Sequence, residues 1–576
     1  MTLPSNVAAD ANINYNKSVS EPGQTNIRIV DSELKDGEVG SRQFITLVDV
    51  ISEGEIAGFP SALDAGFTPG THAYNVASLK DIFLNNTQIL KGSAPNTNPE
   101  DSDFNFGSSQ ANRPYKISRI GTANQTKIQG LTETERDRQI SANVTFTTPQ
   151  TVTITDTSTE GIRVTIGFPR LQKFEDDGNI SGVNVKYKIQ VADQASNVLK
   201  IIVPASSIDS SNHDPEKTVS GGEVDGKSTS PYFKDHIIIL PETLQTSDFP
   251  LTVTVSRLSA DSTDTKVVDA FELTSITELV FDPNNFPNTA VNAIRFDAEV
   301  FRSIPTRTYR VRGRKIAIPH NATVRTDGSL SFSGTFNGTL KTDGSGNIQK
   351  EYCSDPAWVL YDLLTESRAG FGDFVDGTQI DKYAFYNASV YNSELISDGL
   401  GGTSPRFGCN IVIQNETEAY TLLNKIASIM RATLYIDNGS ISLSQDRPTS
   451  STYFFSYANI LEGGFVYTGA SQRTKDTIVN VKYFDNNTRQ YDYETVEDTA
   501  ANQSKYGVVV RTIEAVGCSD RAQARRMGLW HLYTQNNETE TVAFATTADA
   551  ATLIRPGAII SISDPTRTSV RRSGRI

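Results

Sequence analysis

The chain has 576 residues, of which 37% are hydrophobic, and a formal net charge of −14. This length suits about three to five domains of roughly 100–200 residues each, so core size is not limiting. The acidic balance argues against specific nucleic-acid binding, because such a surface needs an excess of Lys and Arg. The polar start of the chain lacks the apolar segment of a signal peptide, and no run of about 18 apolar residues predicts a membrane span.

The first part of the chain alternates between polar loops and short strands. Residues 1–40 are polar and aperiodic and predict a flexible arm. Strand patterns fill residues 41–142 and return over 298–350, so we expect these two segments to form one β-barrel domain. Between them, residues 143–297 carry short strands with turn clusters, which predicts an inserted β-sandwich.

Residues 351–449 predict an α+β domain of three helices followed by a hairpin. Ser354 is the expected N-cap of the first helix, and Pro356 fits its first turn. A second helix fits residues 378–395 and a third fits 416–430. The apolar positions of the first and third helices are Trp358, Tyr361, Leu363 and Leu364, and Ala419, Leu422, Leu423, Ile426 and Met430. The hairpin pairs residues 433–436 with 440–444 around Asn438-Gly439, a dipeptide that tolerates the positive φ of a type I′ turn.

Residues 450–576 return to strand patterns and predict a second β-barrel domain, incomplete at its end. One helix interrupts it, with Ser519 as its expected cap. Its expected apolar face comprises Ala522, Leu529, Trp530 and Tyr533, and its polar face Arg521, Arg525 and Arg526. The predicted fold class is therefore mainly β with a smaller α+β part, in several domains.

Residues 221–228, GGEVDGKS, match the P-loop pattern G-x-x-x-x-G-K-[ST]. A P-loop follows a buried strand and opens a helix whose N–H groups cradle a phosphate. Here a polar stretch precedes the motif, Pro231 breaks any helix after it, and Glu223 and Asp225 would repel a phosphate. We therefore expect no nucleotide or other cofactor.

No other pattern predicts a metal ligand or a catalytic residue. Asp101, Asp103 and Asn105 have the spacing of a calcium loop, but Gly107 falls one position late and Asn112 stands where Glu is needed. The histidines are isolated in sequence and form no zinc pattern: His72, His213, His236, His320 and His531. The cysteines are far apart and are expected to be buried thiols: Cys353, Cys409 and Cys518. The flanking sequence FGCNIVI, typical of a buried strand, disfavours a nucleophilic role for the second of them.

A basic run occupies residues 301–315, FRSIPTRTYRVRGRK. Its charged members are Arg302, Arg307, Arg310, Arg312, Arg314 and Lys315. Alternate residues of a strand share one face, so we expect a solvated strand face. A dock for an acidic neighbouring subunit is the alternative.

Segments from about residue 42 to the end resemble one protein family in order and spacing. They include LVDVISEGEIAGF, LKDIFLNNTQIL, YRVRGRKIAIP, the stretch from Ser354 to Pro448 with DGLGGTSPRFGCN, VEDTAANQSKYG, AVGCSDRAQARRMGLWHLYTQNNETETVAF and RPGAIISISD. Together they resemble the N-terminal, tail-embedded part of the host specificity protein J family, the tail-tip proteins of lambda-like siphophages.

The resemblance implies a structural virion protein and no enzyme: a homotrimeric hub at the distal end of a long non-contractile tail, assembled in the host cytoplasm. Two similar barrels per chain would present six contacts and adapt three-fold to six-fold symmetry. The implied partners are the distal tail ring protein, the C-terminal end of the tape-measure protein and other tail-tip proteins. The hub would lead into a central host-recognition fibre, through which alone the host receptor is reached, and would take part in adsorption and DNA ejection. An acidic lumen would let DNA pass without binding it.

Two alternatives of other classes stay open. A tail-associated peptidoglycan hydrolase would need two carboxyl groups about 5–9.5 Å apart in an open cleft. A carbohydrate-binding adhesin would need an aromatic-lined groove on the inserted sandwich.

Overall fold

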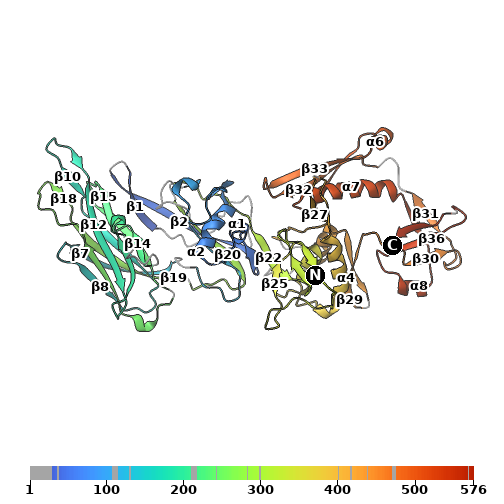
Figure 1. Ribbon diagram of the computed structural model, residues 1–576, viewed down its shortest axis with the longest axis horizontal. Coiled ribbons are helices and arrows are strands. Elements are labelled where there is room, and N and C mark those ends of the chain that lie inside the picture. Colours follow the sequence, from blue (N-terminus) through green and yellow to red (C-terminus); the bar gives the residue numbers. More distant parts are fainter. Residues whose placement is uncertain are drawn as a thin grey trace. The chain divides into compact units, whose positions relative to one another are not determined.

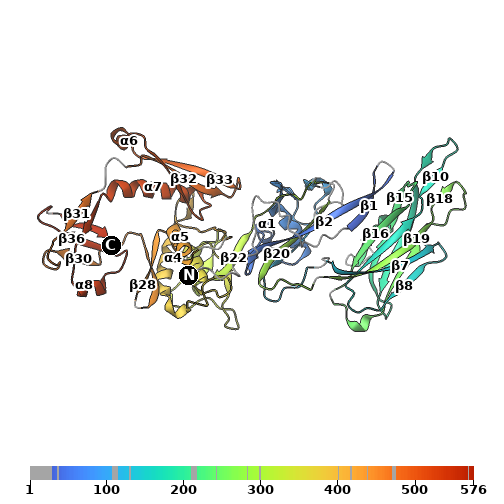
Figure 2. The same cartoon turned by 180° about the vertical axis from the view of Figure 1, so that it is seen from behind.

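The computed structural model describes residues 29–576 except 36–37, 107–114, 129–131, 209–216, 242, 282, 298–299, 302, 400, 415–417, 438, 470–474 and 569. They form two compact units, one ending at Arg312 and the other beginning at Gly313 (Figure 1, Figure 2). Strands dominate both units, so the fold is mainly β with a smaller α+β part, as predicted. Among the described residues, none of the helices combines the length and apolar character needed to cross a bilayer.

The N-terminal unit is built on a four-stranded antiparallel sheet in the order β1-β2-β20-β6. Its strands are β1 (Ile29–Lys35), β2 (Glu38–Glu53), β20 (Thr289–Asp297) and β6 (Tyr115–Ile120). A second sheet has the order β21-β4-β5, with bounds Arg307–Tyr309, Ile82–Leu84 and Thr87–Gln88. The shorter elements are β3 (Ile56–Gly58), α1 (Pro60–Leu63), α2 (His72–Ala77) and the 3₁₀ turns Ser78–Asp81 and Asp101–Asp103. These elements enclose one apolar core that includes Leu47, Tyr74, Ile82, Ile294 and Phe296.

The inserted sandwich lies between β6 and β20 in sequence and is drawn in teal to green in Figure 1. One sheet has the order β14-β13-β12-β17-β8, with β15 also pairing with β12, and the other has the order β16-β9-β19-β7. The bounds are β7 (Thr132–Val144), β8 (Gln150–Ile154), β9 (Gly161–Phe168), β12 (Val183–Ala192), β13 (Val198–Val203), β14 (Thr218–Ser220), β15 (Glu223–Gly226), β16 (Tyr232–Ile239), β17 (Leu251–Arg257) and β19 (Phe271–Phe281). A small third sheet joins β10 (Gln172–Phe174), β11 (Ile180–Ser181) and β18 (Val267–Val268), and the 3₁₀ turns are Ala205–Ser207 and Thr246–Asp248. The two large sheets share one core, to which β17 contributes every second side chain.

The structure differs from the predicted domain boundaries in three places. Residues 29–35 and 38–40 form β1 and the start of β2, so the predicted arm over 1–40 is too long, and residues 1–28 lie outside the described part. The sequence contains Asp36-Gly37, a dipeptide typical of hairpin turns, but the polar composition of this segment led to the prediction of a flexible arm. β20 falls inside the predicted sandwich range but pairs with β2 and β6, a long-range contact that local patterning cannot reveal.

The third difference concerns the start of the C-terminal unit. The sequence places residues 313–350 in the first barrel, whereas Ile316 and Leu330 share a core with Trp358, Phe385 and Ile426 of the helices. The strands of this region are β22 (Arg312–Ala317), β23 (Ala322–Val324), β24 (Leu330–Phe332) and β25 (Lys350–Tyr352). They pair as β22–β25 and β23–β24.

The three predicted helices are present but shorter. They are α3 (Pro356–Thr365), α4 (Lys382–Asn392, after the 3₁₀ turn Gly377–Gln379) and α5 (Ala419–Ile429). Asp355, not Ser354, caps α3, because Pro356 takes the first helical position and the cap is the residue before it. Asp381 caps α4 and sets its later start. The predicted hairpin is confirmed as β28 (Ala432–Asp437) and β29 (Ser440–Gln445), beside the small pair β26 (Leu395–Ser397) and β27 (Thr403–Pro405).

The rest of the C-terminal unit consists of small sheets and three helices. The sheets have the orders β33-β32-β34, β30-β36-β37 and β31-β35. The bounds are β30 (Tyr453–Ser456), β31 (Val466–Gly469), β32 (Ile478–Asp485), β33 (Gln490–Glu497), β34 (Val510–Glu514), β35 (Glu540–Ala543), β36 (Ile559–Ser563), β37 (Arg572–Arg575), α6 (Ala500–Tyr506), α7 (Arg521–Asn537) and α8 (Ala548–Leu553). Asp520, not Ser519, caps α7. The described pairings give sheets of two to four strands in the hub segments, and closure of either segment into a barrel stays a prediction.

Candidate functional site

The P-loop match at residues 221–228 lies beside and along β15 of the sandwich. The N–H groups of Gly221 and Gly222 both donate to the carbonyl oxygen of Val203, at 3.1 and 3.0 Å. A Cβ atom on Gly222 would lie 2.3 Å from the carbonyl oxygen of Tyr187, so close strand packing requires glycine there. These N–H groups therefore serve the backbone of the sandwich, not a phosphate.

Asp103 and Asn105, in the segment with the rejected calcium-loop spacing, bond to backbone groups. Asp103 Oδ2 accepts the N–H of Glu100 at 2.9 Å, and Asn105 Nδ2 donates to the carbonyl of Gln88 at 2.8 Å. Among the described residues, no cluster of three or more His, Cys, Asp or Glu is placed to hold a metal ion. The other two positions of the pattern, Gly107 and Asn112, lie outside the described residues.

Two of the histidines have buried or half-buried polar partners. His236 Nε2 lies 2.7 Å from the Tyr187 hydroxyl inside the sandwich, and burial, assisted by Lys234, lowers the pKa of this imidazole to about 3. His531 Nε2 lies 3.0 Å from Asp476 Oδ2. The remaining histidines are His72, at the start of α2, His320, stacked on Phe336, and His213, outside the described residues.

The three cysteines are buried and unpaired. Burial raises the pKa of Cys409 to about 12, and the same effect raises the pKa of Cys518 to about 12. Burial also raises the pKa of the Cys353 thiol well above its usual value. A nucleophilic cysteine needs the opposite shift, because the thiolate is the reactive form.

The basic run faces the protein's own carboxylates. Arg307 forms a two-pronged ion pair with Asp49, at 2.6 and 2.7 Å, and Arg310 Nε donates to Asp81 Oδ1 at 2.8 Å. Arg307, with a side chain only 5% exposed, is therefore not on a solvated face, whereas Arg310 is 52% exposed and keeps solvent contact beside its ion pair. The dock for an acidic neighbour stays a prediction. Arg312 pairs with Asp64 at 2.8 Å, Arg314 pairs with Glu366 at 2.8 Å, and Arg302 lies outside the described residues.

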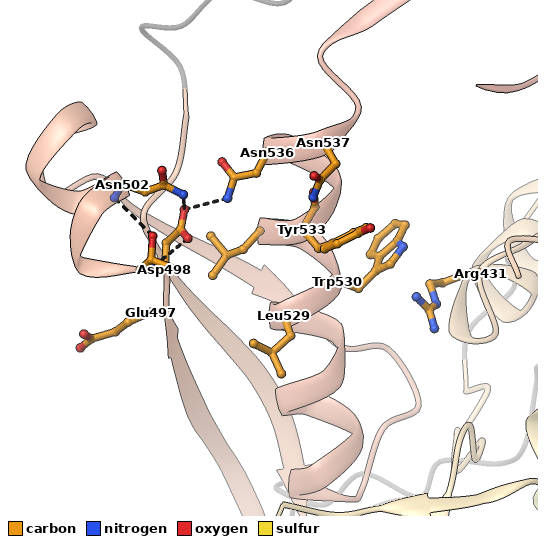
Figure 3. A pocket seen from close by; sticks show the side chains of 11 residues that line it. Arg431, Glu497, Asp498, Asn502, Leu529, Trp530, Tyr533, Asn536 and Asn537 are labelled. Atoms are coloured by element: carbon orange, nitrogen blue, oxygen red, sulfur yellow. Dashed lines mark hydrogen bonds between the residues drawn. The ribbon is translucent and has the colours of Figure 1, made fainter. Parts of the chain in front are cut away.

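The C-terminal unit carries an open cleft of about 610 Å³ along α7. It is lined by Arg431, Glu497, Asp498, Thr499, Asn502, Leu529, Trp530, Leu532, Tyr533, Asn536 and Asn537. Figure 3 shows the aromatic side chains of Trp530 and Tyr533 projecting from α7 on the side of Arg431. The cleft thus combines an apolar, aromatic wall with a row of amide groups.

Each end of the cleft is fixed by polar contacts. Asp498 accepts hydrogen bonds from the amide nitrogens of Asn502 and Asn536, at 2.9 and 2.8 Å, which ties α6 to α7 (Figure 3). At the other end, Trp530 Nε1 donates to Asp446 Oδ2 at 3.1 Å. The Arg431 guanidinium lies 5.3 Å from the Trp530 ring centroid.

Arg431 occupies an unusual position for a charged residue. It follows the last turn of α5 with a φ of +54°, a left-handed conformation that glycine usually supplies. Its guanidinium lies 4.8 Å from the Phe407 ring as well as near Trp530, so it lies between two aromatic faces. Burial lowers the pKa of Arg431 below its ordinary value. The surrounding structure therefore holds a strained cation at the rim of the cleft.

The carboxylates that line the cleft are both engaged by amides. Asp498 accepts from two asparagines, and Glu497 Oε2 accepts from Gln503 Nε2 at 3.3 Å. An acid–base pair for glycoside hydrolysis needs one carboxyl group that is held protonated. The lining is better suited to contact with another protein, because aromatic residues and Arg are enriched in interface cores.

The sequence prediction for α7 is wrong about the buried face. Leu529 and Tyr533 are 47% and 66% exposed, while small residues meet the sheet beneath. A Cβ on Gly528 would lie 2.7 Å from Val496 Cγ2, so the helix approaches β33 where its side chains are small. The buried positions are Ala522, Gln523, Ala524, Gly528 and Leu532. The four-residue spacing of Ala524, Gly528 and Leu532 is the sequence pattern from which the buried face could have been predicted.

Two family descriptions match parts of the chain. "Tip attachment protein J, FNIII-A domain" matches residues 134–282, which is the inserted sandwich, and "Putative phage tail protein" matches residues 418–576, which include the cleft. Two relatives, each called Tip attachment protein J, are 32% identical over 553 residues (Escherichia phage SECphi27) and 30% identical over 453 residues (Escherichia phage SECphi4). The alignments cover 95% and 77% of this chain but 41% and 36% of the relatives, so the chain spans well under half of their length.

Two solved structures show weak likeness. The 43 kDa tail protein of prophage MuSo2 from Shewanella oneidensis is 10% identical, with 72% of this chain and 86% of that chain covered and a TM-score of 0.22. Prophage tail protein gp18 from Listeria monocytogenes EGD-e is 12% identical, with 32% and 53% covered and a TM-score of 0.18. With TM-scores this low, the description of the fold rests on the chain's own strand pairings.

The sandwich and the cleft-bearing part each match a phage tail family, so the chain is a phage tail protein. More closely, it belongs to the tip attachment protein J family, whose relative from phage SECphi27 aligns with 95% of its length.

Proposed function

We propose that this chain forms the hub of a phage tail tip, a structural component that closes the distal end of a long non-contractile tail and leads into the central host-recognition fibre. The observation that carries the proposal is the alignment with Tip attachment protein J over 95% of the chain. In this proposal the hub takes part in adsorption and DNA ejection, and no described residue is assigned a catalytic or cofactor-binding role.

A homotrimer is the assembly that this proposal requires. Two hub segments per chain, residues 41–142 with 298–350 and residues 450–576, would give a trimer six similar contacts for a six-fold tail ring. The distal tail ring protein, the C-terminal end of the tape-measure protein and other tail-tip proteins are the proposed partners. The net charge of −14 per chain supports a lumen that repels DNA instead of binding it.

The cleft along α7 is the proposed contact for one of these protein partners. Leu529 and Tyr533 expose large apolar surfaces beside Trp530, and Arg431 is held at the rim. Such a patch, rimmed by amides, is typical of a site that another protein covers. No comparable observation supports peptidoglycan hydrolysis, or carbohydrate binding by the sandwich.

Light scattering on the purified full chain tests the assembly. We expect a mass near three times 62.9 kDa for the chain alone, or a complex that contains three copies of the chain after addition of the distal tail ring protein. The double variant Leu529→Asp/Tyr533→Asp should reduce binding of the ring or neighbouring tail-tip protein at least tenfold. Ile436→Asp changes a 78% exposed apolar residue of β28 outside the cleft and is the matched control. A chain that stays monomeric under both conditions contradicts the trimeric hub, and equal binding by both variants contradicts the role of the cleft.

A further inference from the structure

A lysine is buried in the core of the N-terminal unit. Lys116 of β6 is 1% exposed, and its Nζ lies 3.5 Å from the centroid of the Phe59 ring and 5.5 Å from that of Tyr74. Burial lowers the pKa of Lys116 well below its usual value, although Asp81 opposes the effect. The neutral amine, which is the nucleophilic form, is therefore favoured at this position.

The buried side-chain amide of Asn75 and the amine of Lys116 both contact the hydroxyl group of Ser118. Lys116 Nζ lies 3.4 Å from Ser118 Oγ, and the same hydroxyl donates to Oδ1 of Asn75 at 3.3 Å. Asn75 is 8% exposed and belongs to α2, which packs on β6. The amine and the carboxamide thus meet at Ser118, whose hydrogen bond also polarises the carbonyl group of the amide.

A buried carboxylate completes the cluster. Asp81 is 0% exposed, accepts the N–H of Ser61 at 2.7 Å and is paired with Arg310. It follows α2 directly in sequence, in the 3₁₀ turn that ends the α2 segment. Its negative charge acts on Lys116 and stabilises positive charge that develops on the attacking nitrogen.

We propose that Lys116 and Asn75 form an intramolecular isopeptide bond in the folded chain. Lys116 Nζ attacks Cγ of Asn75 and forms a C–N bond, and the bond from Cγ to Nδ2 breaks. One hydrogen of Nζ is transferred through the Ser118 hydroxyl to Nδ2, which leaves as ammonia. The reaction needs no oxidant, metal or cofactor, and it converts one amine and one amide into one new amide and ammonia.

The bond would tie α2 to β6 and close a loop from residue 75 to residue 116. A covalent cross-link of this kind restricts the unfolded chain, as a disulfide does, but reducing agents do not break it. The N-terminal unit would therefore keep α2 on its sheet under conditions that unfold the rest of the chain.

Intact-mass spectrometry of the denatured full chain tests the proposal. We expect a mass below the sequence mass by one ammonia, about 17 Da, and a branched peptide that joins the segments carrying residues 75 and 116. Lys116→Met should restore the full sequence mass. Asn75→Asp should instead lose one water, because a carboxylic acid then replaces the amide.

Asn-Gly pairs provide the internal control. Asn337-Gly338 and Asn438-Gly439 can lose ammonia as cyclic imides, but that loss persists in Lys116→Met and yields no branched peptide. A full sequence mass for the folded wild-type chain overturns the proposal. A branch to Asn292, which pairs with Ser118 across the strands and is 0% exposed, overturns the assignment to Asn75.

Discussion

Arg307 and Asp49 are 258 residues apart in sequence, yet the guanidinium donates to both carboxylate oxygens at 2.6 and 2.7 Å. The pair joins β21 to β2, and the Tyr309 hydroxyl donates to the same carboxylate. The side chains are only 5% and 15% exposed. Burial alone would lower the pKa of Arg307, but Asp49 more than offsets this and raises it. The segments before and after the inserted sandwich are therefore joined by a buried charge pair.

Asp49→Asn should strongly destabilise the N-terminal unit. The change leaves the Arg307 charge buried without its counter-charge, and removing one partner of a buried pair costs about 3–5 kcal/mol. Calorimetric unfolding of the full chain should show a lower melting temperature for the transition of this unit. Arg312→Ala is the control, since its partner Asp64 is 62% exposed and the pair should contribute about 1 kcal/mol or less. Equal shifts for the two variants would contradict the assigned role of burial.

His236 should make the sandwich less stable in mild acid. Its pKa is near 6.5 in the unfolded chain and about 3 in the folded chain, so unfolding takes up a proton between these values. The stability that depends on this residue is full above about pH 6.5 and falls by about 1.4 kcal/mol per pH unit as the pH drops towards 3. His236→Gln retains a partner for the Tyr187 hydroxyl and cannot titrate. The melting temperature of the wild type should therefore fall relative to this variant from pH 7 to pH 4, and a constant difference would refute the prediction.

Asp355 should give the C-terminal unit the opposite pH dependence, with a stability contribution that falls as the pH rises. Burial raises its pKa to about 6, although the N–H groups of Ala357 and Trp358 favour the charged form. The folded chain holds this proton more tightly than the unfolded chain, so the contribution is full below about pH 4 and is lost as the pH rises through 6. The loss is about 3 kcal/mol for a shift of about two pKa units.

Asp355→Asn removes this titration and keeps a good helix cap. The variant should be more stable than the wild type at pH 8, and the difference should disappear at pH 4. Urea unfolding of the C-terminal unit at the two pH values measures this. A variant that is destabilised equally at both would show that the carboxylate is needed for reasons other than its charge.

Gly528→Ala should destabilise the C-terminal unit although alanine favours helices by about 1 kcal/mol. The added Cβ would meet Val496 Cγ2 at 2.7 Å and Val481 Cγ2 at 3.1 Å, so α7 would have to move away from its sheet. Overpacking of this kind costs about 1–3 kcal/mol. Gly344→Ala, with no atom within 4 Å of the new Cβ, is the control for thermal unfolding. A rise in melting temperature for Gly528→Ala would mean that the helix is not held this closely.

Local patterns predicted the elements whose stabilising contacts are close in sequence. The apolar positions of α3 are all buried, and the Asn438-Gly439 hairpin pairs in the expected register. β20 could not be assigned, because its partners β2 and β6 precede the whole sandwich. The contacts of Arg307 and Arg310 could not be predicted for the same reason, since their carboxylate partners lie more than two hundred residues away. The cleft depends on an exposed aromatic face of α7, and periodicity alone cannot tell which apolar face of a helix is covered.

The strands that begin and end the sandwich in sequence, β7 and β19, pair antiparallel, with Thr132 opposite Phe281. The strands that lead to and from it, β6 and β20, also pair, with Ile120 opposite Ala290. The inserted segment therefore leaves and rejoins the hub at one place. A domain with adjacent ends can be shortened, replaced or removed with little strain on its host. A tail-tip lineage could thus exchange this module by recombination while the surrounding hub keeps its fold.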